Sequence, residues 1–157
     1  TDDGLPMFGH CSVLRRVPVL ADTRAPLVEV SRLAVSRASL AVDEDAAGRS
    51  GAAARERRHA ARFEMITVLY RELYQASKRH GFTHWLVATE PSLQRLVVKF
   101  RFPFVQVGPL TDYFGPVAPY LMDVREFEQE ILRGEAPALH GFLDGLAPQF
   151  APVPHGR

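Results

Sequence analysis

The stretch Glu29-Val30-Ser31-Arg32-Leu33-Ala34-Val35 combines the composition of a buried β-strand with three polar side chains. Successive residues of a strand point to opposite faces, so Glu29 and Ser31 share one face and Arg32 lies on the other. A carboxylate, a hydroxyl and a guanidinium are costly to bury unless they are paired or take part in chemistry. Two interpretations stay open: a structural ion pair in which Arg32 holds a neighbouring strand, and a functional site.

The segments around this stretch predict a strand followed by a long helix. An irregular region rich in glycine and proline is expected over residues 1–26, and the strand over 27–35. Residues 36–55 are rich in Ala, Asp, Glu, Gly and Ser and have no apolar period, which predicts a mobile loop. Apolar residues then recur at three-to-four spacing over 56–80, which predicts an amphipathic helix that ends at Gly81.

The second half of the chain predicts further strands and helices. A strand covered on both faces is expected at 82–89, and Thr89 is the predicted N-cap of a helix that opens at Glu90-Pro91-Ser92. Another strand is expected at 104–107. Glycine and two prolines within 113–124 predict a strand broken by turns, or an edge strand. The remaining elements are two helices and a proline-rich tail, at 123–133, 137–146 and 147–157.

Length and composition indicate one globular domain. The 157 residues suffice for a hydrophobic core, with 46% hydrophobic residues, 24% charged residues and a formal net charge of +1. The order of elements predicts a single α/β domain over residues 1–157. One cysteine, Cys11, excludes an intrachain disulfide and a cysteine-based zinc site. No apolar run approaches the roughly 20 residues of a membrane span, so we expect no membrane span and a cytoplasmic location.

Generic catalytic and cofactor motifs are absent from the sequence. It contains no phosphate-binding loop, dinucleotide glycine fingerprint, His-Glu-x-x-His or nucleophile elbow, and its six histidines lie at no metal-ligand spacing, so no metal site is expected. Nucleic-acid binding is not expected, because the basic residues are not interleaved with exposed aromatic residues. A basic cluster in the long helix indicates either a solvated face or a surface for an anionic partner. It comprises Arg55, Arg57, Arg58 and Arg62.

An ordered set of motifs resembles a known family. The set consists of Glu29-x-Ser31-Arg32-Leu33-x-Val35, a variable loop, a long helix, Thr83-His84-Trp85-Leu86-Val87-Ala88-Thr89, Glu90-Pro91-Ser92-Leu93-x-Arg95-Leu96 and Val107-Gly108-Pro109-Leu110-x-Asp112-Tyr113. Together these motifs resemble the PEP-CTERM/exosortase-system-associated acyltransferases and the related N-acyl amino acid synthases. More distantly, Glu29 and Arg32 look like the Glu-x-x-Arg of the acyl-homoserine-lactone (autoinducer) synthases. All of these enzymes belong to the GNAT acyltransferase superfamily.

The resemblance implies a fold and an activity. The fold would be GNAT-like, a central mixed and splayed sheet flanked by helices. The activity would be transfer of a long-chain fatty acyl group to the amine of an amino acid or similar small molecule. The donor would be a thioester of acyl carrier protein or coenzyme A, with no permanently bound cofactor. The stretch Gly48-Arg49-Ser50-Gly51-Ala52 departs from the superfamily's pyrophosphate loop, which favours acyl carrier protein as partner. Family members also carry an N-terminal segment that we expect to be missing before Thr1.

The same resemblance assigns roles to individual residues. Glu29 would be the general base, Ser31 would bind substrate or an ordered water, and Arg32 would hold Glu29 or a substrate carboxylate. The basic cluster would contact the carrier protein or a phosphate. Core packing stays open as the alternative for the residues that would line the acyl chain and donor, which are Leu33, Val35, Trp85, Val87, Thr89, Leu93 and Leu96.

Two other functions stay open alongside this one. The first is a homoserine-lactone synthase, which would release acyl lactones where the preferred activity yields acyl amino acids. The second is a non-catalytic module that only docks acyl carrier protein. Mass spectrometry of lipid extracts separates the two enzymes, and a thioester-consumption assay separates either enzyme from the module.

Overall fold

The computed structural model describes residues 6–9, 11, 14, 16–21, 26–30, 52–99, 101–112, 115–134 and 137–153. The chain divides into two compact units, of which one comprises 1–31 and 74–157 and the other 32–73. The described part of the second unit is helical. The first unit contains the sheet and every other described element. The expectation of a single domain over 1–157 stays a prediction.

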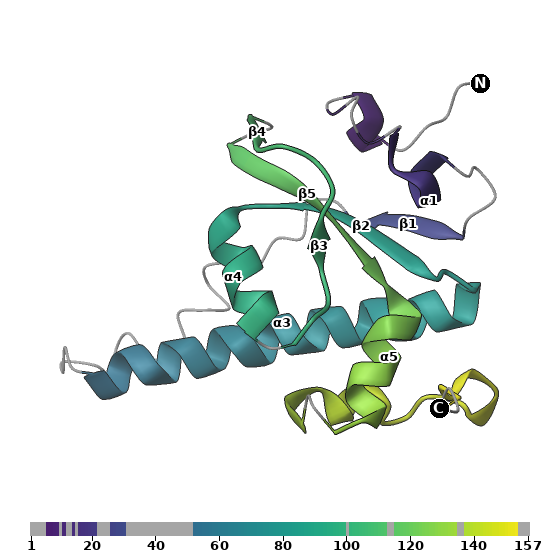
Figure 1. Cartoon of the computed structure of the whole chain (residues 1–157). Coiled ribbons are helices and arrows are strands. Elements are labelled where there is room, and N and C mark those ends of the chain that lie inside the picture. Colours follow the sequence, from purple (N-terminus) through teal and green to yellow (C-terminus); the bar gives the residue numbers. More distant parts are fainter. Residues whose placement is uncertain are drawn as a thin grey trace. The chain divides into compact units, whose positions relative to one another are not determined.

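A mixed five-stranded sheet forms the centre of the first unit, which confirms the α/β class (Figure 1). β1 and β2 are parallel neighbours, and β2 pairs on its other side with the antiparallel β5. Both β3 and β4 pair antiparallel with β5. The strands span Leu27–Val30 (β1), His84–Thr89 (β2), Val105–Gln106 (β3), Thr111–Asp112 (β4) and Pro116–Asp123 (β5).

Three longer helices and several short helical turns complete the described elements. No helix among the described residues is both long and apolar enough to cross a membrane. The long helices are α3 (Ala52–His80), α4 (Pro91–Lys99) and α5 (Val124–Leu132); α1 (Pro18–Ala21) and the 3-10 turns η1 (Pro6–Gly9), η3 (Pro137–Phe142) and η4 (Pro148–Phe150) are short.

The predicted long helix is confirmed as α3, and its end follows from its sequence. Gly81 has φ of 73°, a left-handed conformation that costs glycine little. Its N–H donates to the Lys78 carbonyl at 3.4 Å, and the next N–H, of Phe82, donates to the Ser77 carbonyl at 2.9 Å. These two bonds form a Schellman motif, which satisfies carbonyls that the helix end leaves free.

Several predicted boundaries differ from the structure. α3 begins at Ala52, so the predicted loop over 36–55 is wrong at its end, and residues 36–51 lie outside the described part. Glu90, rather than Thr89, is the N-cap of α4, because its carbonyl accepts the first intrahelical bond from Gln94 N–H at 3.0 Å. The N-terminal region contains two short helical turns, η1 and α1, where irregular structure was expected.

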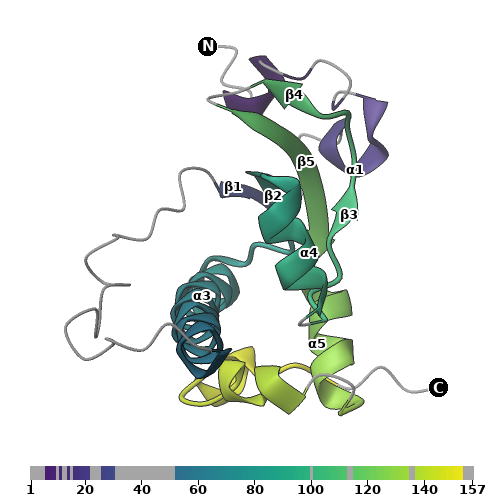
Figure 2. The ribbon, with the colours of Figure 1, turned by 90° about the vertical axis from the view of Figure 1, so that its left-hand side faces the viewer.

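The strand predicted within 113–124 is confirmed as β5, but the expected break or edge position was wrong, because β5 runs unbroken over Pro116–Asp123 and is an inner strand of the sheet (Figure 2). Pro119 is tolerated because of the side to which its backbone points. Its carbonyl accepts the Val107 N–H at 3.0 Å, so its nitrogen also faces the segment between β3 and β4, and no bond to β2 is lost. The backbone of Gly108 lies close to the Pro119 ring, because a Cβ at Gly108 would be only 2.6 Å from Pro119 Cγ.

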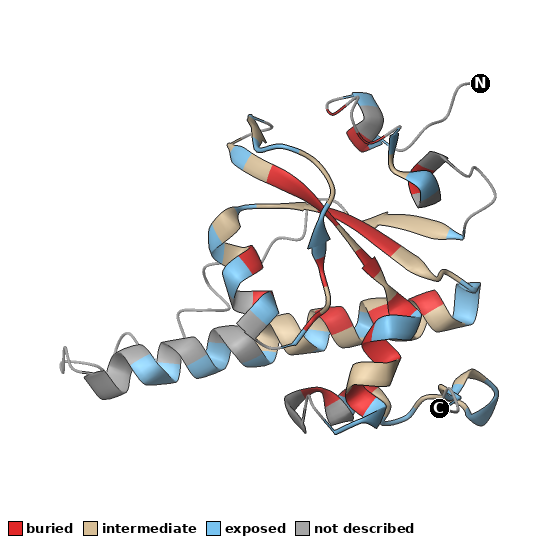
Figure 3. Ribbon diagram, in the orientation of Figure 1, coloured by how far each residue is buried: buried red, intermediate tan, exposed pale blue. Residues whose placement is uncertain are grey.

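Residues of the two faces of the sheet pack against different parts of the chain, and Figure 3 marks the buried residues along the ribbon. On one face, Leu86 packs against buried residues of the N-terminal segment. On the other face, Trp85 donates from its indole nitrogen to Ser77 Oγ at 2.8 Å, which ties β2 to the last turns of α3. An aromatic cluster fills the region near α5, with ring centroids 5.1–6.3 Å apart. It comprises Tyr74, Phe102, Phe104, Phe127 and Phe142.

Candidate functional site

Glu29 lies on β1 opposite Leu86 of β2, so both side chains project from the same face of the sheet. The side chain of Glu29 is half-buried, and its Oε2 accepts a hydrogen bond of 3.0 Å from the backbone N–H of Met7. Its other oxygen has no hydrogen bond to a described residue. Two predicted partners, Ser31 and Arg32, lie outside the described residues, and their roles stay predictions.

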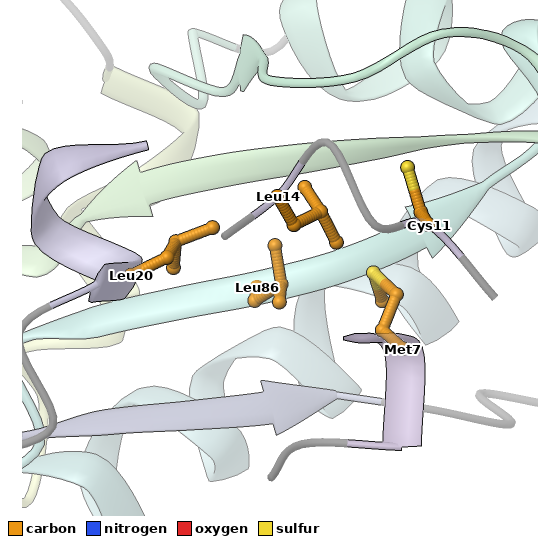
Figure 4. Packing of buried hydrophobic residues seen from close by; sticks show 5 residues of the cluster. All are labelled: Met7, Cys11, Leu14, Leu20 and Leu86. Atoms are coloured by element: carbon orange, nitrogen blue, oxygen red, sulfur yellow. The ribbon is translucent and has the colours of Figure 1, made fainter. Parts of the chain in front are cut away.

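The face on which Glu29 lies is covered by the N-terminal segment of the chain (Figure 4). The side chains of Met7, Leu14 and Leu20 gather around Leu86, and Cys11 belongs to the same cluster with its Sγ beside Gly108; each of the four is at most 7% exposed. The backbone hydrogen bonds of the described residues of this segment join them to one another, from Met7 to Leu20. Apolar packing and the Met7–Glu29 bond therefore hold it to the sheet.

The residues predicted to line the acyl chain lie on the opposite face from Glu29. Trp85 and Val87 alternate with Leu86 along β2, and both are buried, with 0% and 4% of their surface exposed. The bond from Trp85 to Ser77 makes Trp85 a core residue in this structure. Thr89 and Leu93 are half-buried at the junction of β2 and α4. Leu33, Val35 and the side chain of Leu96 lie outside the described residues.

The basic cluster in α3 belongs to the second unit. Arg57 is exposed there. The side chains of Arg55, Arg58 and Arg62 lie outside the described residues. An anionic partner for this cluster stays a prediction.

A buried polar cluster joins α5 to the last turns of α3, and the sequence analysis missed it. Glu128 is 5% exposed and accepts hydrogen bonds from Tyr74 Oη at 2.8 Å and Lys78 Nζ at 2.6 Å. Burial, followed by the negative charge of Glu128 and the hydrogen bond to it, raises the pKa of Tyr74. The spacing of Tyr74 and Lys78 places both on one helix face, but nothing local in sequence pairs them with Glu128. Its groups are mutually satisfied, which indicates a structural role.

A second polar group lies where β5 runs into α5. Asp123 Oδ1 accepts the Arg125 backbone N–H at 2.8 Å and caps α5, as predicted for this residue. The guanidinium of Arg125 also contacts both oxygens, at 3.2 and 3.0 Å. His84 Nε2 lies 3.6 Å from Asp123 Oδ2, and its Nδ1 lies 2.9 Å from Thr83 Oγ1. Burial alone would raise the pKa of Asp123, but the bonds from Arg125 and the charges of Arg125 and His84 outweigh it and lower this pKa.

Of these groups, Glu29 is a half-buried carboxylate with an oxygen that has no hydrogen bond to a described residue. Among the described residues, no three His, Cys, Asp or Glu side chains gather as metal ligands. A half-buried carboxylate with one uncommitted oxygen can accept a proton from an amine or from a bound water. Comparison of the chain with protein-family models, curated proteins and solved structures found no match.

Proposed function

We propose that the protein is an N-acyltransferase that moves a long-chain fatty acyl group from a thioester to the amine of an amino acid or similar small molecule. The observation that carries the proposal is the position of Glu29, a half-buried carboxylate on a strand of a mixed sheet with one oxygen uncommitted among the described residues. The donor would be acyl carrier protein, with coenzyme A as the other candidate.

The arrangement of strands supports a GNAT-like fold for the chain. The resemblance implies a mixed sheet in which the Glu29 strand neighbours the strand that follows the long helix. β1 and β2 are parallel neighbours with α3 between them in sequence, and β5 pairs antiparallel with β2. Among the described residues, β1 pairs with β2 from Leu27 opposite His84 to Val30 opposite Val87. In the proposed fold the donor's pantetheine arm would lie beside the last residues of β2.

The reaction needs a neutral amine, because an α-amino group is largely protonated at neutral pH. The ammonium group would first lose one proton to solvent. The neutral nitrogen then bonds to the thioester carbonyl carbon while Glu29 takes a second proton from it, directly or through one water, and the carbon–sulfur bond breaks so that the thiolate leaves. The proton held by Glu29 returns to the departing sulfur, so the carboxylate is regenerated.

Replacing Glu29→Gln tests this role, because the amide keeps a hydrogen-bond acceptor for Met7 and loses the basic carboxylate. We expect the rate of acyl transfer to fall by about 10²- to 10⁴-fold, the usual contribution of a general base. We expect the free energy of unfolding to stay close to that of the wild type. The measurement is mass spectrometry of acyl-amine product from palmitoyl-acyl carrier protein or palmitoyl-coenzyme A and a panel of amino acids.

Glu126→Gln is the matched control, since Glu126 is an exposed glutamate on α5. Its transfer rate should equal that of the wild type. Equal rates for Glu29→Gln and the wild type would remove Glu29 from the mechanism.

One observation favours a second candidate, the non-catalytic module that docks acyl carrier protein. The bond from Met7 N–H gives Glu29 a structural task that does not require catalysis. The same assay decides between the two. A module would bind the loaded carrier protein and leave its thioester intact with every amine.

A further inference from the structure

We infer that the N-terminal segment acts as a cover over Glu29, latched by the Met7 N–H, and that the acceptor amine opens it. The inference rests on the proposed function, because it describes how the acceptor reaches the same carboxylate. The latch is the bond of 3.0 Å from Met7 N–H to Glu29 Oε2. The cover consists of the buried side chains of Met7, Cys11, Leu14 and Leu20 over Leu86.

The backbone N–H of Met7 and the acceptor amine would compete for the same carboxylate, that of Glu29. Met7 N–H already binds one of the two carboxylate oxygens, and the Met7 side chain, 5% exposed, packs over the strand beside Glu29. A substrate amine would donate to the same carboxylate as the backbone N–H does. An ammonium group forms charge-assisted hydrogen bonds with both partners ionised, and these are stronger than those of a neutral amide donor. The ammonium group of the acceptor can therefore displace the Met7 N–H from Glu29.

The way the cover is attached makes its opening local. Among the described residues, the backbone hydrogen bonds of the segment run within it, and no strand pairing joins it to the sheet. Opening would expose the four buried side chains of the cover but leave the paired strands intact, and local opening of this kind costs less free energy than unfolding of the whole fold. In the described part of the chain, the polar bond between the cover and β1 is that of Met7 with Glu29, and release of Glu29 would remove it.

The chain contains its own reporter for this opening. Cys11 is the single cysteine of the sequence, belongs to the cover, and is 7% exposed. A thiol reagent reaches its sulfur only when the cover opens, so the labelling rate of Cys11 measures the open fraction. This readout does not depend on any catalytic activity.

The first test compares Cys11 labelling in Glu29→Ala and Val30→Ala. Both substitutions shorten a half-buried side chain of β1, but Val30 points to the other face of the sheet. We expect labelling to be roughly tenfold faster in Glu29→Ala, as expected from the loss of a hydrogen bond to a charged group. Val30→Ala should label close to the wild-type rate. Equal rates in the two variants would overturn the latch.

The second test uses the wild-type protein and so does not depend on a variant that folds. Leucine, glycine and lysine are added in turn, with N-acetyl-leucine as the control that lacks the basic amine. At least one free amino acid should raise the labelling rate to a plateau, and N-acetyl-leucine should not. The same amino acid should have no effect on Glu29→Gln. If none of the amino acids changes the labelling rate of Cys11, the proposed competition is wrong and Glu29 only holds the N-terminal segment to the sheet.

Turnover measured on the same samples separates this inference from the proposed function. Product formation without amine-dependent labelling would keep the transferase and remove the cover. Amine-dependent labelling without product would keep the cover as an amine-gated segment and remove acyl transfer.

Discussion

At the scale of single residues, Glu128 is a buried carboxylate that accepts hydrogen bonds from both Tyr74 and Lys78. Its carboxylate is 6% exposed at the side chain and is neutralised by Lys78. Removing one partner of a buried ion pair leaves the other charge uncompensated in a medium that solvates it poorly. We expect Lys78→Met to lower the free energy of unfolding by about 3 kcal/mol, measured by urea denaturation.

Arg133→Met is the matched control, because Arg133 pairs with Glu130 at 3.3 Å with its own side chain 55% exposed. Exposed pairs contribute less than about 1 kcal/mol, so this variant should remain near the wild type. The double change Lys78→Met with Glu128→Leu should recover part of the loss. A cost for Lys78→Met no larger than that for Arg133→Met would contradict the burial argument.

Which residues could be predicted from sequence depends on how local their partners are. Asp123 was predicted as a helix cap because its partner, the N–H of Arg125, is two residues away. The partners of Glu128 are 50 and 54 residues away, and Met7 is 22 residues from Glu29. No periodicity brings such pairs together, so the sequence marked Glu29 as unusual without indicating what it binds.

At the scale of elements, α3 and α4 end in the same motif with different residues at the left-handed position. Gly81 ends α3 with φ of 73°, and Arg101 follows α4 with φ of 67°. Arg101 N–H donates to Val98 O at 2.9 Å and Phe102 N–H to Val97 O at 3.1 Å, the same pair of bonds as at Gly81. A residue with a Cβ pays roughly 1–2 kcal/mol in this conformation, whereas glycine does not.

Arg101→Gly is therefore expected to raise the free energy of unfolding by up to about 1 kcal/mol, after the greater chain entropy of unfolded glycine is subtracted. Gly81→Ala is expected to lower it by about 1 kcal/mol. Thermal unfolding followed by circular dichroism measures both changes. Changes of opposite sign in the unfolding free energy would support a cost of the left-handed conformation at Arg101. A lower unfolding free energy for Arg101→Gly would contradict it.

The elements themselves were largely predictable where their signals were strong. The long apolar period of α3 and the continuous apolar run from Trp85 to Ala88 predicted their types correctly. The strand within 113–124 was predicted, but its inner position was not, because prolines usually mark edges or breaks. Its central position depends on Pro119 pointing toward the gap between β3 and β4, a property of the sheet register that a single sequence does not display.

At the scale of the whole molecule, the ionisation of Asp123 makes the free energy of unfolding depend on pH. Its pKa is 3.8 when unperturbed and lower in the folded protein. The carboxylate of Asp123 therefore binds a proton more readily in the unfolded chain than in the folded protein. The stabilisation is complete above about pH 4 and is lost as the pH falls further, through the folded pKa.

Asp123→Asn isolates this contribution, because asparagine still caps a helix but does not ionise near these pH values. Urea denaturation of both proteins at a series of pH values measures the difference in unfolding free energy. We expect the difference to be constant from neutral pH to about pH 4 and to shrink below it. A difference that stays constant down to about pH 2 would contradict the lowered pKa.

The α/β class of the molecule follows from the order of its elements, and it is confirmed. The candidate site was less predictable. Glu29 lies on one face of the sheet, and Trp85 and Val87 lie on the other. Alternation within each strand was evident from the sequence, but the parallel register that sets Glu29 opposite Leu86 was not.

The proline within β5 also affects how the molecule meets its neighbours. Because Pro119 interrupts the outer ladder, β3 and β4 form two pieces of two residues each instead of one long strand. Long, continuous outer strands are templates on which other chains add by backbone pairing, the first step toward amyloid-like aggregation. On this border of the described sheet, the interruption protects an exposed valine, Val105, from becoming part of such a template.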